Sequence, residues 1–94
     1  MFEIQVLDEG TVRFSGRFDA SQEEKATAAL KTVNRSVTVD FAELDYISSA
    51  GIGVIIEAWK RLNNSGHTLR LVNLNPRVRN VFAYAGLDKL LQIE

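Results

Sequence analysis

The sequence predicts a single α/β domain over residues 1–94, built on a mixed β-sheet with its helices packed mainly on one face. Two observations support this. The first 14 residues alternate apolar and polar side chains on either side of a turn, which is typical of a β-hairpin. After them, segments of helical periodicity separate segments rich in β-branched residues, and such helical crossovers connect parallel strands. The expected order is strand, strand, helix, strand, helix, strand, helix and a last short strand.

The hairpin consists of Phe2–Val6 and Thr11–Phe14, joined by the turn Asp8-Glu9-Gly10. We expect Gly16 to end the second strand. Asp19 or Ser21 can then cap the first helix, because both side chains accept hydrogen bonds from free backbone N–H groups. The apolar stripe of this helix is narrow and contains Ala26, Ala29, Leu30 and Val33.

The segment 37–62 organises the rest of the chain. Val37-Thr38-Val39 reads as a buried strand that stops at Asp40, followed by a short acidic loop. A helix then begins at Ser48-Ser49-Ala50-Gly51. Apolar residues recur on one face of this helix at Ile52, Ile55, Ile56, Trp59 and Leu62.

The carboxyl-terminal third continues the alternation of strands and helices. Gly66 is placed to end the central helix, and Thr68–Val72 reads as the next strand. Asn75-Pro76 is a strong helix start, because Asn caps helices and Pro suits their first position. Gly86 closes this helix, and Leu90–Ile93 can form a last short strand.

The hydrophobic core is expected to contain the inward-facing side chains of these elements. Trp59 should be partly buried. The predicted core residues are Ile4, Val6, Val12, Phe14, Leu30, Val37, Val39, Ile52, Ile55, Ile56, Leu69, Leu71, Val81 and Phe82.

Composition excludes several classes of function. The net charge is −1, and the Lys and Arg residues are scattered, so no nucleic-acid partner is expected. The chain has no cysteine, which excludes disulfides and thiolate chemistry, and its only histidine is His67. No signal peptide and no apolar run of membrane-spanning length is present. We therefore expect a cytoplasmic protein with no membrane partner.

Ser48 and Ser49 stand where a strand leads into a helix. The structural interpretation is a helix N-cap followed by a second, unengaged hydroxyl. The functional interpretation is that one hydroxyl accepts a phosphate, because the N–H groups at a helix start and the positive end of its dipole favour an anion. Gly51 and Gly53 weaken the first turns of the helix, which indicates that access or close packing matters there.

Other chemistry finds less support in the sequence. Ser49 has no G-x-S-x-G surroundings, and His67 follows the far end of the helix, so we expect no catalytic serine. The acidic residues Asp40, Glu43 and Asp45 have the ligand type that Mg²⁺ prefers, but such residues more often form turns. We expect neither a metal nor a cofactor.

Four segments give the whole chain a resemblance to the STAS domain, in particular to bacterial anti-sigma factor antagonists. Residues 16–20 resemble the family's G-x-L-D-A segment, and residues 37–40 resemble its central strand ending in Asp. Residues 46–52 resemble its signature loop and helix start, and residues 71–87 its closing strand and helix. The usual signature is Asp-Ser-Ser/Thr-Gly, whereas this chain has Ser48-Ser49-Ala50-Gly51.

The resemblance implies partner switching without catalysis by the chain itself. The unphosphorylated antagonist would bind an anti-sigma factor that is also a serine kinase, and so release the sigma factor. Phosphorylation of Ser49, or of Ser48 as the second choice, would end binding, and a serine phosphatase would restore it. The expected partner-binding residues are Asp19, Asp40, Ser48, Ser49, Gly51 and Ile52.

Two other functions stay open. The chain could be a STAS subunit that binds a transporter or another signalling complex without being phosphorylated. A small α/β enzyme using Asp40 and Ser49 is the more distant alternative, because no general base accompanies these residues.

Overall fold

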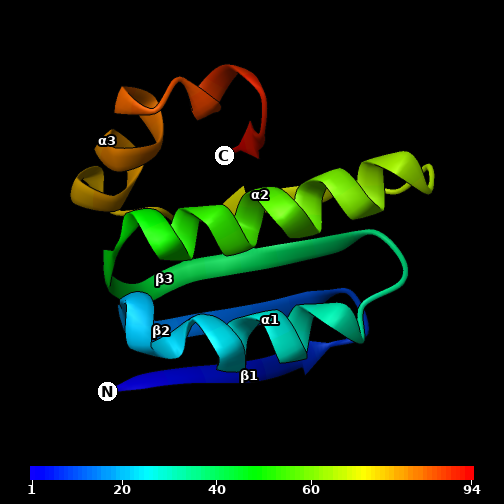
Figure 1. Cartoon of the computed structure of the whole chain (residues 1–94), viewed down its shortest axis with the longest axis horizontal. Helices are drawn as coiled ribbons and strands as arrows, with labels where there is room; N and C mark the ends of the chain where they lie inside the picture. Colours follow the sequence, from blue (N-terminus) through cyan, green and yellow to red (C-terminus); the bar gives the residue numbers. More distant parts are fainter.

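The computed structural model describes all residues 1–94 as one five-stranded sheet with three α-helices (Figure 1). Two short 3₁₀ helices, Ala20–Gln22 and Leu87–Lys89, precede α1 and β5. The elements are β1 (Phe2–Asp8), β2 (Thr11–Phe18), α1 (Glu23–Lys31), β3 (Val37–Ile47), α2 (Ser49–Asn64), β4 (Leu69–Val72), α3 (Pro76–Tyr84) and β5 (Gln92–Ile93). The predicted order of elements and the predicted α/β class are confirmed.

The strands lie in the sheet in the order in which they occur along the chain, β1-β2-β3-β4-β5. β1 and β2 are antiparallel, and every later neighbouring pair is parallel. Figure 1 shows α1 and α2 side by side on the same face of the sheet, running in the same direction. This follows from the right-handed crossovers that connect neighbouring parallel strands.

The two faces of the sheet differ in character. Val12 pairs with Val39, and both are buried on the face that the helices cover. The next residues along these strands, Arg13 and Asp40, also pair, and strand alternation places them on the opposite face. That face carries no α1 or α2, so the polar residues of the strands gather there.

β3 is much longer than the sequence predicted. We expected a strand ending at Asp40 and an acidic loop, but β3 continues to Ile47. Two irregularities in its pairing with β2, after Asp40 and after Leu44, interrupt the alternation. As a result Phe41, Leu44 and Ile47 are buried at a spacing of three, which does not read as a strand in the sequence.

Five phenylalanines form a continuous aromatic row through the core. Ring centroids lie 4.7 Å apart for Phe2 and Phe18, 5.5 Å for Phe14 and Phe18, and 6.0 Å for Phe14 and Phe41. Phe41 in turn lies 6.3 Å from Phe82 of α3. The row therefore joins β1, β2, β3 and α3 beneath the helices.

Most of the predicted core is confirmed, with four differences. Val6 is exposed because β1 is an edge strand, and Ile4, Ile56 and Val81 are only partly buried. Trp59 is partly buried, as predicted. The core also contains buried residues outside the predicted core list, namely Phe2, Phe18, Ala26, Phe41, Leu44, Ile47, Val54, Ala58, Leu62, Val78 and Leu91.

Candidate functional site

The candidate site lies where β2 and β3 end side by side. Phe18 pairs with Ile47, and the Ser48 N–H donates to the Phe18 carbonyl oxygen at 2.9 Å. Asp19 and Ser48 each follow directly on this pair, so the loop before α1 and the start of α2 are neighbours. The carboxyl ends of parallel strands are the usual position of functional loops in α/β sheets.

Ser48 is the N-cap of α2. Its backbone is extended, and its Oγ accepts a hydrogen bond from the Gly51 N–H at 3.1 Å. Because the first N–H groups of a helix have no partner within it, this cap satisfies one of them and leaves those of Ser49 and Ala50 without a helical acceptor. Ser49 is the first residue of the helix and is exposed, whereas Ser48 is half-buried. The two hydroxyls therefore differ in role and in access.

Gly51 and Ile52 lie in the first turn of α2 and pack against the core beneath the site. A Cβ at Gly51 would lie 2.9 Å from Ile47 Cγ1 and 3.2 Å from both Phe18 Cγ and the Phe18 carbonyl oxygen. Gly51 thus lets α2 begin in direct contact with the ends of β2 and β3. Ile52 is 7% exposed and belongs to the core. Both residues are buried and support the residues at the start of α2; that they touch a partner stays a prediction.

Asp19 forms the other side of the site. Its Oδ1 accepts from the Ser21 N–H at 3.0 Å, and its Oδ2 lies 3.6 Å from Arg17 Nε. The hydrogen bonds from the Ser21 hydroxyl and N–H, with the Arg17 charge, lower the pKa of Asp19. The Arg17 guanidinium also lies 4.0 Å from the centre of the Tyr46 ring. Arg17 and Tyr46 were not predicted, because only the pairing of β2 with β3 brings them together.

Asp40 does not join this group. Asp40 lies seven positions before Ile47 in β3, which corresponds to roughly 20 Å at about 3.3 Å per residue, and it faces the side of the sheet away from α1 and α2. The sequence placed Asp40 near the serines because it ended the strand there. The extension of β3 moves Ser48 and Ser49, which we call the serine loop, far from Asp40.

Asp40 is instead the centre of a partly buried hydrogen-bond network. Its Oδ1 accepts from the Ala42 N–H at 2.8 Å and from Asn73 Nδ2 at 3.1 Å, and its Oδ2 accepts from Arg13 Nη2 at 3.0 Å. Burial alone would raise the pKa of Asp40, but these three donors outweigh it and lower the pKa. With its oxygens already engaged, Asp40 acts in this structure as a joint between β2, β3 and the loop after β4.

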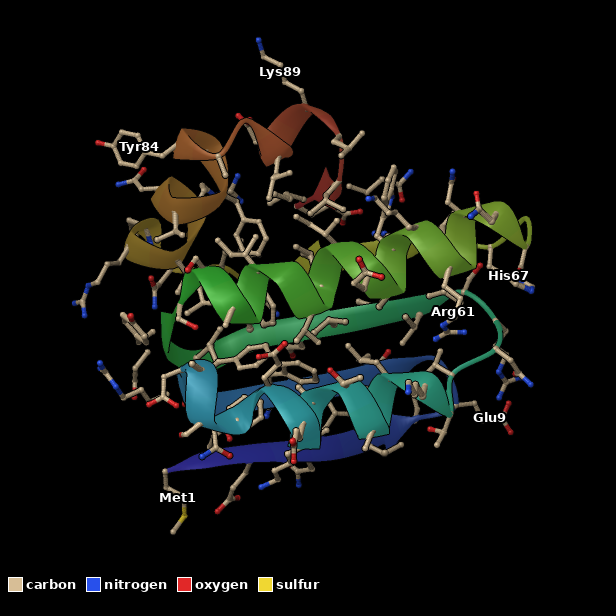
Figure 2. All side chains as sticks on the ribbon, viewed as in Figure 1. Met1, Glu9, Arg61, His67, Tyr84 and Lys89 are labelled. Atoms are coloured by element: carbon tan, nitrogen blue, oxygen red, sulfur yellow. The ribbon has the colours of Figure 1, made fainter.

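Other expected and excluded sites can be placed directly. Figure 2 shows His67 at the opposite end of the molecule from the start of α2, where no contact with the serines is possible. The chain contains no group of three acidic, histidine or cysteine side chains arranged to hold a metal ion. None of its helices has the length and apolar character needed to cross a membrane.

Comparison with known proteins identifies the family. Residues 3–92 match the family described as Mlab, STAS domain. BtrV of Bordetella bronchiseptica, which is named as an anti-sigma factor antagonist, is 39% identical over 71 residues. These cover 76% of this chain but only 61% of BtrV. The anti-sigma-B factor antagonist of Listeria monocytogenes is 30% identical over 84 residues, or 85% of this chain and 74% of that protein.

Solved structures share the fold. SpoIIAA, an anti-sigma factor antagonist, superposes in its unphosphorylated form with a TM-score of 0.79 at 24% identity, covering 100% of this chain and 88% of SpoIIAA. The phosphorylated form of SpoIIAA, a cell fate determinant of Bacillus, gives a TM-score of 0.72 at 22% identity, covering 100% and 91%. With nearly its whole length matched, the chain belongs to the STAS domain family, and the relatives named here are anti-sigma factor antagonists.

Proposed function

We propose that this protein is an anti-sigma factor antagonist that works by partner switching, with Ser49 as its phosphorylation site. The unphosphorylated chain binds an anti-sigma factor that is also a serine kinase, which releases the sigma factor. The kinase transfers the γ-phosphoryl group of ATP to Ser49 Oγ, and ADP leaves. A serine phosphatase then hydrolyses the phosphoserine with water, releases inorganic phosphate and restores binding.

One observation carries the choice of Ser49. Its side chain is exposed at the first position of α2, whereas the Ser48 hydroxyl is engaged as the N-cap. A kinase can reach Ser49 without unfolding the helix start. Modification of Ser48 would remove the acceptor of the Gly51 N–H, so Ser48 is the less favourable site.

The physics of a phosphate at this position supports a switch in binding. A phosphoryl group adds about −1.5 to −2 charges at neutral pH. The free N–H groups at the start of α2 and the helix dipole can hold such a group with little change in the fold. An interface centred on Ser49 would then lose shape and charge complementarity. That SpoIIAA has been solved in both forms with this same fold is consistent with this expectation.

The action of the protein in this proposal is binding, and no catalytic role is assigned to its residues. Asp19, Arg17 and Tyr46 lie at the ends of β2 and β3, next to the residues that lead into Ser48 and Ser49, and supply charged and aromatic groups of the kind that partners recognise. Asp40, being remote and buried, is assigned to the fold and not to the contact surface.

The test is to incubate the purified protein with ATP and each anti-sigma factor kinase of the same genome, followed by intact mass measurement and phosphopeptide mapping. One added phosphate on Ser49 is the expected result. The Ser49→Ala variant should bind the kinase and resist modification, whereas Ser49→Asp should bind weakly. A phosphate on Ser48 would correct the residue but keep the mechanism. If kinases bind but modify neither serine, the switch is wrong and a binding subunit without phosphorylation takes its place.

A further inference from the structure

A groove of about 340 Å³ runs between α1 and α2, on the face of the molecule turned toward the viewer in Figures 1 and 2. Its lining includes Gly53, which lies one turn beyond Ser49, and Thr27 of α1. Glu23 and Glu57 also line it, as do Lys31 and Arg61. The groove therefore starts beside the serine loop and leads away from it along both helices.

Gly53 has no evident reason to be glycine in the fold. Its φ is not positive, and a Cβ at this position would meet no atom within 4 Å. The contrast with Gly51 is direct, because a Cβ there would collide with Ile47 and Phe18. A glycine inside a helix destabilises it relative to alanine. The open space above Gly53 thus comes at the expense of helix stability, with no gain in packing.

The charges around the groove are separated along its length. Glu23 lies at the Gly53 end and Glu57 lies midway, four residues from both Gly53 and Arg61 on α2; neither acidic residue forms an ion pair in the structure. Lys31 and Arg61 lie toward the other end, where Arg61 Nη2 donates to the Leu30 carbonyl oxygen at 2.6 Å. Gly53 and Arg61 are eight residues apart on α2, a distance of about 12 Å at about 1.5 Å per residue.

We propose that this groove is a docking site for an α-helix of the protein partner. The partner helix places a Lys or Arg side chain over Gly53, between Glu23 and Glu57. About two turns along the same face, it presents an Asp or Glu side chain to Lys31 and Arg61. The identity of the partner as the kinase rests on the proposed function, but the groove itself does not. In this arrangement Gly53 leaves room for close approach, and the separated charges set the direction of the helix.

Gly53→Ala is the most informative variant, because a glycine needed for the fold and a glycine needed for access by a partner predict different results. Filling the space should raise the melting temperature yet weaken binding to the kinase by roughly tenfold or more, as expected for a central contact. Asn64→Ala, an exposed change at the far end of α2, is the control and should leave affinity unchanged. The double variant Glu23→Gln, Glu57→Gln should weaken binding without unfolding the chain. Normal kinase binding by Gly53→Ala would overturn the proposal.

A second measurement does not require the kinase. The ¹⁵N-labelled chain is titrated with butylguanidinium, which mimics an arginine side chain, and amide shifts are followed by NMR. Saturating shifts at Gly53 and Glu57 that disappear in the Glu23→Gln, Glu57→Gln variant are expected. If the wild-type chain binds no kinase, the proposed function fails, and this titration alone decides the groove. Amide shifts of similar size near every exposed Asp and Glu residue would then reject the groove as a binding site.

Discussion

Asn73 Nδ2 donates a hydrogen bond to Asp40 Oδ1 at 3.1 Å, and Asn73 is the one non-glycine residue with a positive φ, at 61°. Asparagine tolerates this conformation better than most residues. Asp40 also accepts from the Ala42 N–H, at the irregularity that redirects β3. The pair therefore ties the loop that leads to α3 to the point where β3 changes its alternation. That alternation decides which side chains of β3 lie beneath the serine loop.

Replacing Asp40 with asparagine should lower the free energy of unfolding by roughly 2 kcal/mol at neutral pH, because the amide cannot accept from all three donors. The pKa of Asp40 is lower in the folded than in the unfolded chain. The stabilisation is therefore complete above the ordinary pKa of about 4 and is lost as the pH falls through the folded-state pKa.

Urea unfolding of both proteins between pH 7 and pH 3 measures this difference. It should be constant down to about pH 5 and shrink below about pH 4. Asp45→Asn, at an exposed position of the same strand, is the control and should show little difference at any pH. A difference between wild type and Asp40→Asn that grows toward low pH would contradict the assignment.

The two serines should contribute unequally to stability. Ser48→Ala removes the N-cap of α2 and should lower the free energy of unfolding by about 1 kcal/mol. Ser49→Ala, at an exposed helical position, should change it by less than about 0.5 kcal/mol. Chemical denaturation of both variants gives the comparison, and a larger loss for Ser49→Ala would reverse the roles assigned here.

The two glycines of α2 should respond oppositely to alanine. Gly51→Ala forces a Cβ against Ile47 and Phe18, and should cost about 1–2 kcal/mol even after the gain in helix propensity. Gly53→Ala meets no atom and should stabilise by up to about 1 kcal/mol. Thermal unfolding of the two proteins tests the signs. A loss of stability for Gly53→Ala would show a contact that the structure lacks.

Asn75 uses both ends of its side-chain amide. Its Oδ1 accepts from the Val78 N–H at 2.8 Å as the cap of α3, and its Nδ2 donates to the Leu44 carbonyl oxygen at 2.9 Å. Asn75→Ala should cost roughly 2 kcal/mol, because it removes both bonds. Asn75→Asp keeps the cap but loses the donor.

Hydrogen exchange separates the two effects of Asn75. Protection of the amides around Leu44 should fall in both variants, because β4 pairs only with Val37–Asp40 and Asn75 holds the later part of β3. Protection at the start of α3 should fall in Asn75→Ala alone. Equal loss at α3 in the two variants would mean that the side-chain oxygen does not serve as the cap.

Sequence patterns predicted those elements whose signals are local. Asn75-Pro76 marked the start of α3, and Ser48 marked the start of α2, because capping depends on a few neighbouring residues. Val12, Phe14, Val37 and Val39 were correctly placed in the core, because they alternate within regular stretches of strand. At these positions, the local sequence pattern and the tertiary contacts favour the same structure.

Features that depend on distant contacts were missed. The later half of β3 has its pairing shifted twice, so Phe41, Leu44 and Ile47 do not alternate, and the acidic residues between them suggested a loop. Val6 has the pattern of a core residue, but no element covers its position on the edge strand β1. The same long-range cause separated Asp40 from the serines.

The identity of strand order in the sheet and strand order in the chain has a consequence for biosynthesis. As the polypeptide leaves the ribosome, every new strand from β2 to β5 can join the free edge of the strand made just before it. No strand has to enter between two that are already paired, and no early strand has to wait for the last one to be made. Because the amino-terminal strands leave the ribosome first, the sheet can assemble in the order of synthesis. The unfinished sheet then exposes one growing edge at a time, which limits misassembly with other nascent chains.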